Sequence, residues 1–70
     1  MIDLGAKLGL TSGEQRVFTR ILLGETYKEI AAALGCTVKN VEFHASNILR
    51  RAHARSMKKL VAEMTHHARV

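Results

Sequence analysis

The chain has 70 residues, a net charge of +5 and no proline, and 47% of its residues are hydrophobic. This length allows one small domain, and the hydrophobic content excludes an intrinsically disordered chain. The lack of proline and the abundance of good helix formers favour an all-α fold. Its single cysteine, Cys36, excludes an internal disulfide and a cysteine-based metal cage.

The excess of basic residues lies in the second half of the chain. Residues 1–35 carry four basic and four acidic residues, whereas residues 36–70 carry seven basic residues against two acidic ones. Clustered Lys and Arg favour a polyanionic partner such as nucleic acid, because they release counterions from a phosphate backbone. The alternative is a solvated basic surface. No signal peptide or membrane-spanning run is visible, and we expect a soluble cytoplasmic protein.

The pattern of the first quarter of the chain predicts a leader and then a helix. Residues 1–9 contain two glycines and no regular period, so we expect a flexible leader there. Thr11 and Glu14 form a capping box that opens a helix over 12–23, and Gly24 ends it. The predicted buried face follows helical spacing and consists of Val17, Phe18, Ile21 and Leu22.

A second capping box, Thr26 with Glu29, opens a helix over 27–34. Its inward residues are predicted to be Ile30, Ala31 and Leu34. Gly35 ends this helix, and Thr37 caps the next one almost immediately. So short a turn constrains the angle between two helices, which is typical of a helix-turn-helix unit.

The third helix is predicted over 38–52, with one buried stripe at intervals of four, three and four residues. The stripe consists of Val41, Ala45, Ile48 and Ala52. Polar, basic and aromatic side chains lie on its other faces, namely Lys39, Glu42, Phe43, Ser46, Asn47 and Arg50. In a helix-turn-helix unit this second helix is the one that enters the DNA major groove.

A fourth helix is predicted over 57–67, capped by Ser56. Its apolar stripe consists of Met57, Leu60, Val61 and Met64. The sequence therefore predicts an all-α, four-helix helix-turn-helix domain over 10–67, followed by a C-terminal tail over 68–70.

Several of these residues occur together, in the same order and spacing, in one known family. They are Leu10-Thr11 with Glu14, Gly24, Lys28-Glu29-Ile30-Ala31, Leu34-Gly35, Val41, His44, Ile48-Leu49, Arg51, Ser56 and Leu60. Over roughly residues 10–64 the chain resembles the DNA-binding domain of bacterial transcription regulators of the LuxR/GerE/NarL type. The resemblance implies a sequence-specific regulator, located at the nucleoid, that binds double-stranded DNA as a homodimer through its fourth helix.

The resemblance also assigns roles to particular residues. It implies base reading by Glu42, Phe43 and Ser46. It implies phosphate contacts by Lys28, Thr37, Lys39, Asn47, Arg50 and Arg51. It implies a dimer contact by Met57, Leu60, Val61 and Met64.

Phe43 is the most informative single residue of this set. Its functional interpretation is contact with a thymine methyl group, and the alternative is packing against the first helix or the leader. Glu42 can accept a hydrogen bond from cytosine N4, but it also repels phosphates. Ala52 and His53 stand where relatives commonly have leucine and glycine, which leaves the shape of the link to the fourth helix open.

The sequence gives little support for a metal site or for catalysis. His44 is expected to be a half-buried packing and hydrogen-bonding residue, and the other histidines lack the companions of a zinc site. No serine or cysteine has a base and an acid arranged around it, so we expect no enzyme, no metal and no cofactor.

Two other functions remain open. A sigma-factor region 4-like domain resembles the same stretch and would read a promoter as part of RNA polymerase, without dimerising. A protein-interaction module could keep this fold after losing DNA binding.

Overall fold

The structure is a computed structural model and describes residues 9–68, with side chains described through residue 64. The predicted leader and the predicted tail lie almost entirely outside these residues and stay predictions. Within the described residues the chain forms four helices and no strand: α2 (Ser12–Leu22), α3 (Tyr27–Leu34), α4 (Val38–Ala52) and α5 (Met57–Ala68). No helix end differs by more than one residue from the prediction, so the all-α prediction is confirmed.

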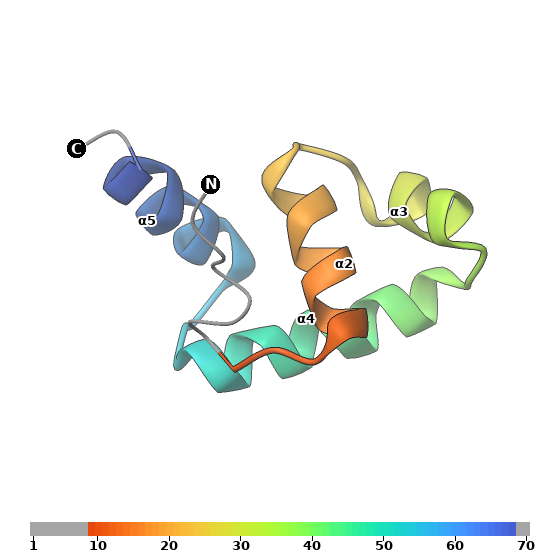
Figure 1. Cartoon of the computed structure of the whole chain (residues 1–70), viewed down its shortest axis with the longest axis horizontal. Helices are drawn as coiled ribbons and strands as arrows, with labels where there is room; N and C mark the ends of the chain where they lie inside the picture. Colours follow the sequence, from red (N-terminus) through yellow and green to blue (C-terminus); the bar gives the residue numbers. More distant parts are fainter. Residues whose placement is uncertain (1–8, 69–70) are drawn as a thin grey trace.

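Helix α4 is the scaffold on which the others are arranged. It lies along one side of the molecule, with α2 above it and with α3 and α5 toward its two ends (Figure 1). It contacts each of these three helices, and α2 also contacts α3 and α5. One face of α4 is therefore committed to the interior.

Each helix begins at a hydroxyl that satisfies a free backbone N–H group. Thr11 Oγ1 accepts from Glu14 N–H at 3.2 Å, and the Glu14 carboxylate accepts from Thr11 N–H at 3.0 Å. Thr26 and Glu29 repeat this reciprocal pair at 3.1 and 2.7 Å. Two further caps are made by Thr37 and Ser56, which accept from the backbone N–H groups three residues on. Both predicted capping boxes and both predicted single caps are confirmed.

Each of the three loops between consecutive helices contains a residue in the left-handed backbone region. Gly24, Gly35 and His53 have φ angles of 87°, 69° and 53°. At the end of α4, Ala54 N–H donates to Leu49 C=O at 2.9 Å and His53 N–H donates to Arg50 C=O at 3.2 Å. These two bonds form a Schellman closure, which usually needs glycine. His53 therefore takes the backbone conformation that the missing glycine would have had.

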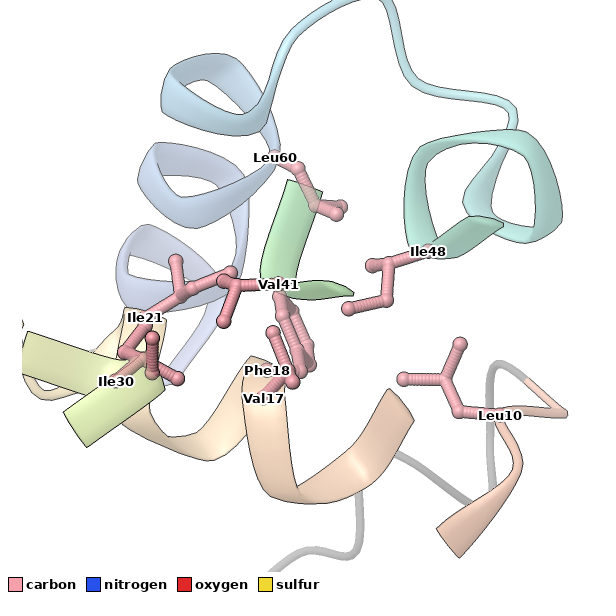
Figure 2. Close-up of a cluster of buried hydrophobic side chains, with 9 residues drawn as sticks. Leu10, Val17, Phe18, Ile21, Ile30, Val41, Ile48 and Leu60 are labelled. Carbon is pink, nitrogen blue, oxygen red and sulfur yellow. The ribbon is translucent and has the colours of Figure 1, made fainter. Parts of the chain in front are cut away.

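The four helices meet in one hydrophobic core (Figure 2). Its buried members are Leu10, Val17, Phe18, Ile21, Ile30, Ala31, Val41, Ile48 and Leu60. Ala45 is also buried, whereas Leu22, Leu34 and Ala52 lie half-buried at the edge of the core. The predicted inward stripes of α2, α3 and α4 are confirmed, and the side of α4 opposite its stripe faces outward.

Candidate DNA interface

The outward face of α4 carries the three residues predicted to read bases. Glu42, Phe43 and Ser46 are exposed, and the Phe43 side chain keeps 63% of its surface accessible. The ring of Phe43 meets the ring of His44 edge to face, with centroids 5.9 Å apart. Among the described residues, Phe43 does not pack into the core, which leaves a large apolar group on a face that is otherwise polar.

Basic groups flank this face at both ends of α4. Lys39 lies in its first turn, Arg50 lies in its last turn, and both are exposed. Lys28 is exposed in the first turn of α3. Within the described residues, the ion pairs join Arg20 to Glu25 and Arg51 to Glu14. The charges of Lys28, Lys39 and Arg50 are therefore not neutralised by a carboxylate of the described chain.

The other two polar candidates are placed differently. The Thr37 hydroxyl caps α4 through Asn40 N–H at 3.1 Å and is exposed at the tip of the turn. Asn47 is half-buried beside the α4 stripe. Thr37 therefore lies at the start of α4, and Asn47 is less accessible than the exposed residues of α4.

Arg51 has an internal partner that the sequence did not reveal. Its Nε lies 2.9 Å from Oε1 of Glu14, and its Nη1 donates to Gly9 C=O at 3.3 Å. The Glu14 side chain is only 4% exposed, whereas that of Arg51 is 46% exposed. A buried carboxylate is costly without a charged partner, so Arg51 stabilises the start of α2 from the end of α4.

Tyr27 is a neighbour of the interface that sequence reasoning did not single out. Burial raises the pKa of the Tyr27 hydroxyl above its ordinary value, and the negative charge of Glu42 raises it further. The tyrosine stays protonated at neutral pH. Glu42 thus lies within electrostatic range of a residue at the start of α3, which no local sequence pattern indicates.

A comparison with protein families identifies this arrangement. The profile described as bacterial regulatory proteins, luxR family, matches residues 8–64. The chain belongs to the luxR family. The predicted resemblance is therefore confirmed, and the domain is a DNA-binding domain of a transcription regulator, a fold that is not typically enzymatic. No curated protein and no solved structure gave a match.

In this luxR-family domain, the apolar stripe of α5 faces inward. Leu60 is 2% exposed and belongs to the hydrophobic core, where its side chain points in from α5 (Figure 2). Met57, Val61 and Met64 are partly buried against the same core. This corrects the predicted place of Leu60, because the stripe is used to attach α5 to α2 and α4. A dimer contact through α5 stays a prediction, without Leu60.

His44 packs where α4 passes the start of α2. It is half-buried, and a Cβ atom added to Gly13 would lie 3.3 Å from its Cε1 atom. The predicted packing role therefore holds. The predicted hydrogen bond is not made by Nδ1, which is buried and has no partner among the described residues.

Two other features are absent from the described part of this luxR-family domain. Among residues 9–64, whose side chains the structure describes, no group of three His, Cys, Asp or Glu residues could hold a metal ion. In the same part of the chain, no helix is long and apolar enough to cross a membrane.

Proposed function

We propose that this domain binds duplex DNA sequence-specifically to control transcription, with α4 in the major groove. One observation carries the proposal: α4 buries Val41, Ala45 and Ile48 on one side and exposes a face with an aromatic residue on the other. An α-helix with its side chains is about 10–12 Å across, and the major groove of B-DNA is about 12 Å wide. The exposed face of α4 can therefore enter the groove while the domain remains folded.

The three exposed residues in the middle of α4 would read base edges. Phe43 would contact a thymine methyl group, and Glu42 would accept a hydrogen bond from cytosine N4. Ser46 can donate or accept and suits several bases. Because Glu42 also repels phosphates, it lowers affinity for unrelated DNA and thereby strengthens the choice of sequence.

The flanking residues would hold the sugar-phosphate backbone and position α4. Thr37 and Lys39 lie at the start of α4, and Asn47 and Arg50 lie toward its end. Lys28 lies in the first turn of α3. Arg51 acts mainly through Glu14, and the solvent-exposed part of its guanidinium remains able to meet a phosphate. Contacts of this kind fix orientation and carry no sequence information of their own.

A homodimer would place two such helices on two half-sites. Half-sites read by paired helix-turn-helix units are one helical turn of DNA apart, about 34–36 Å, or a multiple of that distance. Selection of bound duplexes from a random pool would reveal a pseudo-palindrome with this spacing. Selected sequences without symmetry would contradict the dimer and leave DNA binding intact.

Salt dependence tests DNA binding itself. The affinity for a selected duplex should fall steeply with salt, and Arg50→Ala should reduce the slope of log K against log salt by about 1. Arg16→Ala is a matched control, because Arg16 is an exposed arginine on α2 outside the proposed interface. Binding that is insensitive both to salt and to Arg50→Ala would overturn the proposal.

The sigma-factor region 4-like alternative differs in its assembly. Such a domain reads its element as one copy, whereas the proposed regulator binds a palindrome as two. Mass in solution, measured with and without a palindromic duplex, separates the two. One protein copy per duplex would favour the alternative.

A second candidate function, contact with RNA polymerase or another protein, rests on one exposed leucine. Leu23 keeps 71% of its surface accessible at the end of α2. It lines a shallow depression together with Arg16, Thr19, Arg20 and Leu34. Leu23→Ser should leave binding to the selected duplex unchanged and abolish any joint complex with polymerase. Unchanged joint binding would exclude Leu23 as the contact.

A further inference from the structure

A small basic pocket lies where α4 ends and the chain turns into α5. This linker pocket has a volume of about 200 Å³ and is lined by Ala52, His53, Ala54, Arg55, Lys59 and Glu63. None of these residues belongs to the base-reading or phosphate-binding sets described above. The pocket therefore calls for a separate explanation.

The pocket presents cationic groups that have no internal partner. Arg55 and Lys59 are exposed, and the side chain of neither takes part in an ion pair or hydrogen bond with the described residues. Ser56 uses its hydroxyl to cap α5 through Lys59 N–H at 3.2 Å. The ammonium group of Lys59 and the guanidinium group of Arg55 remain available to bind an anion. Glu63 is the one acidic residue in the lining, so the charge of the pocket remains positive.

The pocket continues the outward face of α4. Lys39, Phe43, Ser46, Arg50 and His53 follow one another at intervals of four, three, four and three residues, and all five are exposed. Their line ends at His53, which lines the pocket. The Schellman closure at His53 then turns the chain back and brings Arg55 and the start of α5 beside this end.

The length of α4 determines which part of the DNA its C-terminal end would contact. The 15 residues of α4 span about 22 Å, nearly twice the width of the major groove. When the middle of α4 lies over base edges, its last turn reaches the phosphates at the rim of the groove. The linker pocket lies just beyond that turn.

We infer that the linker pocket receives a DNA backbone phosphate outside the bases that α4 reads, with Arg55 and Lys59 as its ligands. The inference rests on the proposed function and extends it to a second phosphate anchor. His53 adds a donor at the mouth of the pocket, and Glu63 opposes binding. The bound group is a phosphodiester, and its recognition is independent of base sequence.

The principal test is a salt titration with a double variant. Removing two phosphate contacts with Arg55→Ala and Lys59→Ala should lower the salt slope by about 1.8. The wild type should therefore lose roughly tenfold more affinity than the variant between 50 and 200 mM salt. The preferred sequence should stay the same. The matched control is Arg16→Ala with Lys58→Ala, which removes the same charge from exposed residues outside the pocket.

A second experiment locates the phosphate. Single neutral methylphosphonates are placed in turn along the flanks of the selected duplex. At one or two adjacent positions, the wild type should lose affinity and the double variant should not. Glu63→Gln should raise affinity for unmodified DNA severalfold, and this variant keeps the test valid if the double variant fails to fold.

The outcomes separate this inference from the proposed function. If the wild type shows no salt-dependent binding to any selected duplex, the proposed function fails. If the wild type binds as expected but the double variant has the slope of its control, the linker pocket is not a phosphate site. Loss of sequence preference in the double variant would also overturn the inference.

Discussion

The two faces of α4 contain opposite kinds of residues and do different work. Val41, Ala45 and Ile48 are buried, and Val41 and Ile48 belong to the hydrophobic core. Phe43 and Ser46 lie within the same turns and are exposed. A helix that is exposed on one side contributes to stability through one face and to recognition through the other. Single substitutions on α4 should therefore change either folding or DNA choice, and rarely both.

The largest effect is expected on the inward face. Ile48→Ala removes a fully buried side chain and leaves a cavity, which should lower the free energy of unfolding by about 2–5 kcal/mol. Urea unfolding followed by circular dichroism measures this loss. A loss below about 1 kcal/mol would contradict the assignment of stability to the inward face of α4.

The next effect concerns Arg51, an exposed residue with an inward partner. Arg51→Ala leaves the buried Glu14 carboxylate with the Thr11 N–H group but without a charged partner, at a cost of about 1–3 kcal/mol. Because Arg51 is about half exposed, the cost should stay below that of a fully buried pair. A double-mutant cycle with Glu14→Gln measures the coupling free energy. A coupling free energy near zero would exclude a stabilising pair with Glu14 and leave Arg51 with a DNA-binding role only.

A smaller effect is expected for Phe43, and it should fall on recognition alone. Phe43→Ala should reduce the preference for thymine at one position by on the order of 1 kcal/mol, since an apolar contact is lost. The free energy of unfolding should change by less than about 0.5 kcal/mol. Competition binding with single-base variants of the duplex provides the measurement. Phe43→Leu should retain part of the preference, and equal preference in all three proteins would exclude a base contact.

The smallest effect is expected at the end of α4. His53 is a non-glycine residue at φ 53°, so His53→Gly should raise the free energy of unfolding by up to about 1 kcal/mol. Ala52→Gly is the matched control, because Ala52 is helical and glycine there should destabilise by about 1 kcal/mol. Thermal unfolding of both variants checks the opposite signs. Equal changes would show that the left-handed closure carries no strain.

The helices could be predicted closely because their signals are local. Each cap joins a hydroxyl to a backbone N–H group three residues away, and each buried stripe repeats within one or two turns. Phe43 stood out for the same reason, since its position relative to Val41 and Ala45 follows from helical spacing alone. Only the structure shows that the Phe43 side chain is exposed, because the leader or a neighbouring helix could have covered it.

Three contacts between helices could not be predicted from such local signals. Glu14 was recognised as a capping residue, but its pair with Arg51 joins two helices that the chain order does not place together. Leu60 has the same spacing whether α5 faces a partner or its own core. The electrostatic effect of Glu42 on Tyr27 likewise depends on how α3 and α4 are docked.

The amino-acid sequence alone determined where the helices begin and end, which side of each is apolar, and which family the chain resembles. These properties depend on hydrogen bonds and periodicities within a few residues. Only the tertiary structure decided that Arg51 neutralises a buried carboxylate, that Leu60 belongs to the core, and that Arg55 and Lys59 line one pocket. Such properties arise when packed helices bring distant side chains together, and burial then decides which charges must be paired and which remain free to bind.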